Sequence, residues 1–256
     1  STTDNGTYKI GDVIAITVTF SEAMTVTGTP QLTLETGTTD ATVDYSSGTT
    51  TSTLTFNYTV ASGHASSDLD YKSTSALALN SGTIRNSAST AATLTLPTPG
   101  AAGSLAANKD LVVEGVVPST PTNLVATSGN TKVVLTWTAN NESDLASYKV
   151  YGGTSANPTT LLATVTSGQT YTHSSLTNGT TYYYRISAVD NAGNESSKTS
   201  DKNAVPKFQK YTVKKDGSGQ YTTIAAAIAA ASSGDTILVA AGTYTENIDY
   251  GGKNVV

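Results

Sequence analysis

Short runs in which apolar and polar residues alternate are the feature that most constrains the fold of this chain. In VIAITVTF (13–20), Ile14, Ile16, Val18 and Phe20 share one face. The same pattern recurs in QLTL (31–34), STLTFNYTV (52–60), ALAL (76–79), TLTL (93–96) and DLVV (110–113). A period of two is typical of strands with one buried face. Turn-forming residues separate the runs, so the sequence predicts an all-β fold with sandwich architecture.

The composition supports this fold class and excludes several functions. Roughly one residue in five is threonine, which favours strands. The net charge of -5 argues against nucleic acid and anionic membrane surfaces as partners. No apolar run is long enough for a membrane span, and the absence of cysteine removes disulfides and thiol chemistry. An acidic, cysteine-free, Thr/Gly-rich chain fits a bacterial extracellular or cell-surface protein.

A proline-marked connection and a change from strand-like to helical sequence pattern divide the 256 residues into three predicted segments. Pro118 and Pro121 lie in VVPSTPTN (116–123) and favour a short, stiff, extended connection. We therefore predict two tandem β-sandwiches, covering residues 1–116 and 117–206. Residues 207–256 form a third segment, which contains the single helical signal.

The second segment resembles a fibronectin type III domain. The resemblance is carried by PTNLVATSGNTKVVLTWTANNESDLASYKVY and SLTNGTTYYYRISAVDNAGNES. It implies that Trp137 lies in the core. It also implies that Leu176 and Tyr182 form a tyrosine corner, in which the phenol bonds back to the backbone. No Arg-Gly-Asp sequence is present to suggest integrin binding.

The first segment resembles a bacterial Ig-like or cadherin-like repeat. The matching pieces are DNGTYKIGDVIAITVTFSEAMTVTGTPQLTL, LTFNYTVASGHASSDLDY and LALNSGTIRNSASTAATLTLP. Such a repeat normally has a strand before the DNGTYKIGD turn, where this chain has almost nothing. We therefore expect an unpaired sheet edge, which a neighbouring domain or another copy of the chain completes.

The third segment resembles the opening of a right-handed parallel β-helix of the pectinesterase and pectin-lyase type. DGSGQYTTI and GDTILVAAGTYTENI carry the resemblance. Thr222 is the expected N-cap of a helix that ends at Ser233-Gly234. Ile237 and Val239 should point inward from the next strand. The resemblance implies a capped first rung, with the parent chain continuing in both directions or neighbouring copies completing the ends head to tail.

No residue is predicted to be catalytic. In esterases of the resembled family, the working aspartates and arginine lie several rungs beyond the GTYTEN motif. Glu246 in that motif is interpreted as a turn-bonding residue, because no partner carboxylate is visible. The DGSG turn (216–219) lacks the Lys-Ser/Thr of a phosphate loop. His64 and His173 are expected to be solvated surface residues, with no zinc site.

Calcium is the one metal cofactor that the composition allows, because it prefers carboxylate and carbonyl oxygens. The candidate ligands lie in the first segment: Asp68, Asp70, Asp4, Asp12 and Glu22. The alternative is that they cap turns and improve solubility. A weaker group consists of Glu142 and Asp144, with Asp190 in a neighbouring loop.

Outward-facing aromatic residues are candidates for contact with a carbohydrate. Tyr183 and Tyr151 are opposite in phase to the inward residues of their strands. The alternative is a cross-strand pair that stabilises the sheet.

These observations predict a non-catalytic segment of a modular bacterial surface protein, which acts as a spacer, in adhesion or in fibre assembly. The alternative is the accessory N-terminal region of a secreted polysaccharide-processing lyase or esterase with its catalytic rungs downstream. The expected partners are neighbouring domains or copies, and a polysaccharide or cell-surface ligand.

Overall fold

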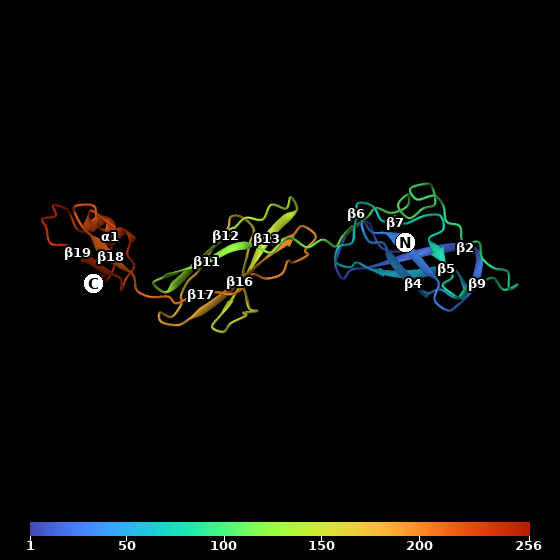
Figure 1. Cartoon of the computed structure of the whole chain (residues 1–256), viewed down its shortest axis with the longest axis horizontal. Coiled ribbons are helices and arrows are strands. Elements are labelled where there is room, and N and C mark those ends of the chain that lie inside the picture. The colour runs from blue at the N-terminus through green and yellow to red at the C-terminus, as the bar shows by residue number, and fades with distance from the viewer. The chain divides into compact units, whose positions relative to one another are not determined.

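The computed structural model describes residues 1–256, which divide into two compact units (Figure 1). The first unit contains Ser1–Pro118 together with Asp190–Glu195. The second contains Ser119–Val189 and Ser196–Val256. Strands dominate both units, as the alternating runs predict, and the chain has one short helix.

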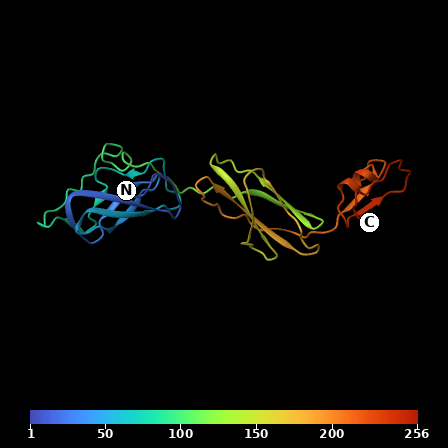
Figure 2. The same cartoon turned by 180° about the vertical axis from the view of Figure 1, so that it is seen from behind.

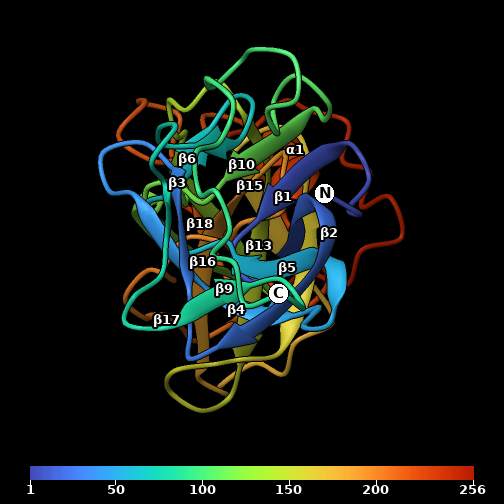
Figure 3. The ribbon, with the colours of Figure 1, turned by 90° about the vertical axis from the view of Figure 1, so that its right-hand side faces the viewer.

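The first unit is built from two sheets. Its strands are β1 (Gly6–Lys9), β2 (Val13–Thr27), β3 (Gln31–Glu35), β4 (Ala41–Ser47), β5 (Thr51–Thr59), β6 (Ala65–Ser66), β7 (Asp70–Tyr71), β8 (Leu77–Ala78), β9 (Thr83–Arg85) and β10 (Leu111–Glu114). One sheet has the order β1-β10-β6, and Figure 3 shows these strands together. The other has the order β7-β3-β4-β5-β2-β9, with β8 also paired to β3. Strands β1 and β10 are parallel neighbours.

The apolar faces of these sheets form one core. Ile14, Ile16, Leu54 and Phe56 are buried in it, and Phe20 packs against it from a partly buried position. The β2–β5 ladder is antiparallel and pairs Ile16 with Phe56. The predicted inward faces of these two strands are therefore confirmed.

One predicted strand is wrong. Residues 93–96 (TLTL) have no ladder partner, although Leu94 and Leu96 pack against the core. Leu96 N donates to Thr74 O at 2.9 Å, and the next residue, Pro97, has no N–H to continue a ladder. The alternation here correctly predicts burial, but burial does not require strand pairing.

The second unit contains a further pair of sheets. Its strands are β11 (Thr122–Gly129), β12 (Lys132–Thr138), β13 (Leu145–Gly153), β14 (Leu161–Val165), β15 (Thr170–His173), β16 (Tyr182–Asp190) and β17 (Lys202–Ala204). The sheets have the orders β11-β12-β15 and β14-β13-β16-β17. In Figure 2 these strands are coloured from green to orange. Trp137 and Tyr184 are buried in their shared core, together with Leu135, Tyr148 and Ile186.

The tyrosine corner implied by the resemblance is present. Thr177 N donates to the hydroxyl of Tyr182 at 3.2 Å, so the phenol ties the start of β16 to the backbone just upstream. Leu176 is buried in the same core. Trp137 is 6% exposed and packs edge-on against Tyr148, as expected for the core position on β12.

The remaining residues form β18 (Lys210–Val213), helix α1 (Ile224–Ala230) and β19 (Thr236–Val239). β18 and β19 pair in parallel, and the helix connects them. The predicted N-cap Thr222 is wrong by one residue. Thr223 is the cap, because its hydroxyl lies three residues before Ala226 N and accepts from it. The helix ends at Ala230, before Ser233-Gly234, and it is too short to cross a membrane.

Candidate functional site

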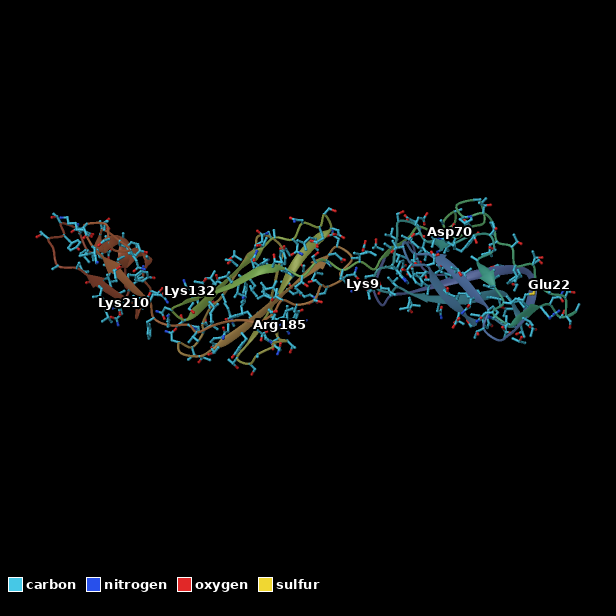
Figure 4. All side chains as sticks on the ribbon, in the orientation of Figure 1. Lys9, Glu22, Asp70, Lys132, Arg185 and Lys210 are labelled. Carbon is cyan, nitrogen blue, oxygen red and sulfur yellow. The ribbon has the colours of Figure 1, made fainter.

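The five predicted calcium ligands occupy different environments in the first unit. Asp4, Glu22 and Asp68 are exposed, whereas Asp70 is 7% exposed. Figure 4 shows Glu22 and Asp70 well apart within the unit. Glu22 accepts a hydrogen bond from Asn86, and Asp12 Oδ2 accepts one from Lys9 N at 3.0 Å. The five carboxylates do not gather around one point, and the calcium assignment stays a prediction.

Asp70 has a structural role in the contacts that it makes. Its Oδ1 accepts from Tyr71 N at 2.9 Å and from Leu105 N at 3.3 Å. Its Oδ2 accepts from Gly100 N at 2.9 Å. A carboxylate inside a protein is stable only when such donors surround it. Asp70 therefore anchors the loop around residues 100–105 to β7.

Glu142 forms a comparable anchor in the second unit. Ser119 N donates to Glu142 Oε1 at 2.7 Å, and Asn140 Nδ2 donates to Ser119 O at 2.6 Å. The backbone N–H of Ser119 holds the pKa of Glu142 far below its ordinary value, at about 2. Together these contacts fix Ser119, directly after Pro118, onto the loop that follows β12.

A cavity of about 420 Å³ lies at this loop and is lined by Ser119, Thr120, Thr122 and residues 139–142. Two buried oxygens, Asn140 Oδ1 and Glu142 Oε2, have no hydrogen-bond partner. These oxygens could ligate a hard cation. Two ligands fall well short of the six to eight that calcium takes.

Both histidines pair with core tyrosines, which corrects the expectation that they are solvated. His64 Nδ1 lies 2.8 Å from the hydroxyl of Tyr58, and His173 Nδ1 lies 3.1 Å from that of Tyr184. Both histidines are half-buried. A buried phenol needs a polar partner, and in each sandwich a histidine supplies it.

Burial changes the acid–base properties of these pairs. It lowers the pKa of His173 below its ordinary value. It raises the pKa of Tyr58 to about 12, and it raises that of Tyr184 further. These shifts favour the neutral forms, as expected for groups removed from water. The geometry supports a structural role for both pairs.

Tyr151 is not on an open face. It is 7% exposed, and Lys198 Nζ lies 4.3 Å from the centre of its ring. The register of the β13–β14 ladder shifts between Val150 and Tyr151. A bulge breaks the alternation of faces, so both residues are buried. The predicted pair of outward tyrosines is therefore wrong at Tyr151, while Tyr183 is half-buried.

Glu246 closes the N-terminus of helix α1. Its Oε1 accepts from Ile224 N at 3.0 Å, and its Oε2 accepts from Ala225 N at 2.9 Å. A helix leaves these first N–H groups without internal partners, and a negative charge is favourable beside them. Sequence reasoning predicted a turn-bonding role for Glu246 but did not identify the helix as its partner, which lies 21 and 22 residues away.

The DGSG turn matches its expectation. Asp216 Oδ1 accepts from Ser218 N at 2.9 Å and from the Ser218 hydroxyl at 2.8 Å. These bonds lower the pKa of Asp216. The motif is thus a tight turn closed by its own side chain.

One family model matches a part of the second unit. Residues 119–202 match the family model of the fibronectin type III domain. Amylopullulanase of Thermoanaerobacterium saccharolyticum is 41% identical over 93 residues, which are 36% of this chain and 7% of that protein. Chitinase A1 of Niallia circulans is 35% identical over 120 residues, which are 43% of this chain and 16% of that protein.

A solved structure of an Fn3-like protein from Clostridium thermocellum is also similar to a part of the chain. It is 33% identical and covers 36% of this chain and 97% of that one, with a TM-score of 0.31. The chain spans only a small part of the amylopullulanase and of the chitinase that it matches, 7% and 16% of their lengths. Residues 119–202 are a fibronectin type III domain, in a chain that carries a further β-sandwich.

Proposed function

We propose that the chain is a non-catalytic accessory region of an extracellular bacterial protein that processes polysaccharides. The observation that carries this proposal is the match of the fibronectin type III domain to segments of an amylopullulanase and a chitinase. Those names favour the enzyme-associated alternative over the predicted surface adhesin or fibre. In this role the two sandwiches, residues 1–116 and 117–206, act as spacers.

The carboxylates with clear partners support a spacer. Asp70, Glu142 and Glu246 all accept hydrogen bonds from backbone N–H groups. Each one fixes a loop, a linker or a helix end. A spacer needs such anchors, because its function is to hold positions rather than to transform a ligand.

We further propose that residues 207–256 open a right-handed parallel β-helix. The support is the parallel β18–β19 pair and a second step of the same kind beside it. Ile237 N donates to Val256 O at 2.7 Å, and Val256 N donates to Asp235 O at 2.9 Å. Stacked parallel steps are how a solenoid grows.

Activity measurements on the purified chain test the non-catalytic assignment. Residues 1–256, incubated with pectin, starch and chitin, should release no reducing ends or unsaturated products. Turnover that disappears in Glu142→Gln or Glu246→Gln would contradict the assignment. The coding sequence beside this region provides a second test. It should encode a polysaccharide-acting module, whereas threonine- and asparagine-rich stacking repeats alone would favour the surface fibre.

The calcium prediction is tested by stability. A ligand that binds only the folded state raises the melting temperature by mass action. The melting temperature in excess calcium should therefore exceed that in excess chelator, and Asp68→Asn should reduce the difference. Equal melting temperatures would show that the calcium prediction is wrong.

A further inference from the structure

Strands β4 and β5 pair over only part of their length. The ladder between them includes Tyr45 and Ser47 of β4 and goes no further. A cavity of about 490 Å³ lies beyond it, lined by residues 40–44, residues 57–59 and His64. Small-molecule sites in proteins have volumes of roughly 300–1,000 Å³, so this cavity is large enough to hold a ligand.

The strand period places polar side chains along both walls of this cavity. Thr42 and Asp44 are the exposed residues in this half of β4, and Asn57 and Thr59 are those of β5. Tyr58, which lies between the last two, is buried. Residues on one face of a strand recur about every 6.8 Å. Each wall therefore presents two polar side chains at about this spacing.

Hydrogen bonds to residues outside the cavity hold two of these side chains in place. Gln31 Nε2 donates to Asp44 Oδ1 at 2.8 Å. Asn57 Nδ2 donates to Ser46 Oγ at 3.0 Å. Asp44 Oδ2 and Asn57 Oδ1 are the oxygens that remain for a ligand. A side chain that is already ordered loses little entropy on binding, which favours affinity.

His64 contributes an imidazole whose position is fixed through both its ring and its backbone. Its Nδ1 lies 2.8 Å from the Tyr58 hydroxyl, and the two rings stack with their centres 5.8 Å apart. The carbonyl oxygen of His64 accepts from Gly115 N at 2.7 Å. A Cβ on Gly115 would lie 2.6 Å from that oxygen, so glycine is required for this approach. Nε2 is the ring atom that remains for a ligand.

The arrangement of these groups favours a ligand with several separated hydroxyls. Asp40, Asp44 and His64 do not gather within 4.8 Å of one another, as ligands to a single metal ion would. Carboxylate and amide oxygens accept hydrogen bonds, an imidazole N–H donates, and threonine hydroxyls do both. A ligand that contacts all of them must donate at some points and accept at others. Hydroxyl groups do both.

The charge of the cavity selects among hydroxyl-rich ligands. Lys72 Nζ lies 3.4 Å from Asp40 Oδ1, but this lysine also pairs with Glu35. Asp44 bonds to the uncharged amide of Gln31. Negative charge therefore exceeds positive charge around the cavity, and like charges across an interface are unfavourable. A polyanion such as a uronate polymer is disfavoured, whereas a neutral saccharide is not.

We propose that this cavity binds a neutral oligosaccharide segment of a polysaccharide, whose hydroxyls bond to Asp44, Asn57 and His64. The inference rests on the proposed function and gives the first sandwich a role beyond that of a spacer. Apart from Tyr58 and His64, no aromatic side chain lines the cavity, so hydrogen bonds provide most of the binding. The dissociation constant is therefore expected to be in the millimolar range.

Titration of the whole 256-residue chain, followed through its amide NMR signals, tests this proposal. The probes are maltohexaose, N-acetylchitohexaose and a galacturonate hexamer. A neutral probe should shift the signals of Thr42, Asp44, Asn57 and Thr59, with a millimolar dissociation constant. The neutral probe that binds more tightly identifies an α-glucan or chitin as the source. The galacturonate should bind about tenfold more weakly or not at all, because Asp44 repels its carboxylates.

One substitution in the cavity and one outside it form a matched pair. Asp44→Asn keeps the oxygen that accepts from Gln31 and replaces the other by a donor. It should weaken neutral binding about three- to tenfold and reduce the discrimination against galacturonate. Glu22→Gln removes the same charge from an exposed residue outside the cavity and should change neither. If Asp44→Asn does not fold, Asn57→Ala provides the same test from the other wall.

Three outcomes would overturn the proposal. The first is that neither neutral probe shifts the cavity amides at tens-of-millimolar concentration. If calcium chloride shifts them instead, the cavity is a cation site. The second is binding that neither Asp44→Asn nor Asn57→Ala weakens, which would place the saccharide elsewhere. The third is galacturonate binding as tight as that of the neutral probes.

Failure of this proposal can be distinguished from failure of the proposed function. Absence of saccharide binding leaves the accessory role intact, because a spacer does not need to hold the polymer. Turnover of a polysaccharide by the chain would overturn the non-catalytic assignment, whether or not the cavity binds a saccharide.

Discussion

At the scale of single residues, the histidines show how a sandwich core accommodates a tyrosine hydroxyl. Tyr58 and Tyr184 are almost fully buried, and His64 and His173 accept or donate a hydrogen bond at the phenol oxygen. The two sandwiches arrive at the same pairing from sequences without local similarity. The requirement to satisfy a buried polar atom explains this repetition.

His173 should make the stability of the second unit depend on pH. Its pKa is lowered by burial, so the unfolded chain binds a proton more readily than the folded one. The free energy of unfolding should therefore be greatest above pH ~6.5 and should fall as the pH decreases through the window below that value. NMR titration should place the ring midpoint of His173 below 6.5, the ordinary value. In His173→Gln this part of the pH dependence should disappear, and an unchanged profile would contradict the assignment.

Glu142 should produce a second, more acidic dependence. Its folded pKa of about 2 lies below the ordinary 4.5, so its contribution is complete above pH 4.5 and is lost as the pH falls toward 2. Urea unfolding should show wild type more stable than Glu142→Gln at neutral pH, with the difference vanishing near pH 2. A difference that persists at the acid end would point to packing instead of charge.

At the scale of elements, the sequence predicts which segments are buried better than it predicts which segments pair. The alternation identifies β2 and β5 correctly, because each contributes one face to a core. It fails at residues 93–96, where the same pattern accompanies an unpaired chain. It also fails at Tyr151, because a bulge arises from the pairing of two strands and has no signal in either strand alone. Glu246 was missed as a helix cap for a similar reason, since its partners are distant in sequence.

Two adjacent glycines in β13 give a prediction about packing in the core. A Cβ on Gly152 would lie 2.5 Å from Leu162 Cδ1 and 3.0 Å from Tyr184 Cδ1. A Cβ on Gly153 would meet only Pro158 Cβ, at 3.8 Å. Gly152→Ala should therefore destabilise the domain by about 1–3 kcal/mol. Gly153→Ala is the matched control and should be close to neutral in denaturant unfolding. Equal effects would mean that the core at Tyr184 adapts to the added methyl group.

The cap on helix α1 gives a prediction for the last element of the chain. Glu246→Gln replaces one acceptor oxygen by a donor and removes the charge beside Ile224 N and Ala225 N. The loss should be about 0.5–2 kcal/mol, seen as faster amide exchange at these two residues. Asp249→Asn removes the same charge from the same segment and keeps the oxygen that accepts from Gly251 N, so it should leave the helix unchanged. Faster exchange in both variants would indicate a general effect of charge.

At the scale of the whole molecule, each unit contains its own apolar core, and no disulfide reinforces either one. The fibronectin type III domain could be predicted from sequence because Trp137, Leu176 and Tyr182 occupy fixed positions in one pattern. The sequence predicts an unpaired sheet edge in the first unit without identifying the strand. The cavity beside β2 depends on residues 93–105, for which the sequence predicts only a strand at 93–96.

The parallel pairing of β1 with β10 determines how the first unit responds to mechanical tension. These are its first and last strands, and they are joined through four residue pairs, from Gly6–Leu111 to Lys9–Glu114. A pull on the two flanking segments draws parallel neighbours in opposite directions along their length. The load is then shared by all the hydrogen bonds between the two strands. These bonds must break together instead of one after another. In single-molecule stretching, this unit should rupture at a higher force than one whose end strands are antiparallel, and Val112→Pro, which interrupts the β1–β10 pair, should lower that force.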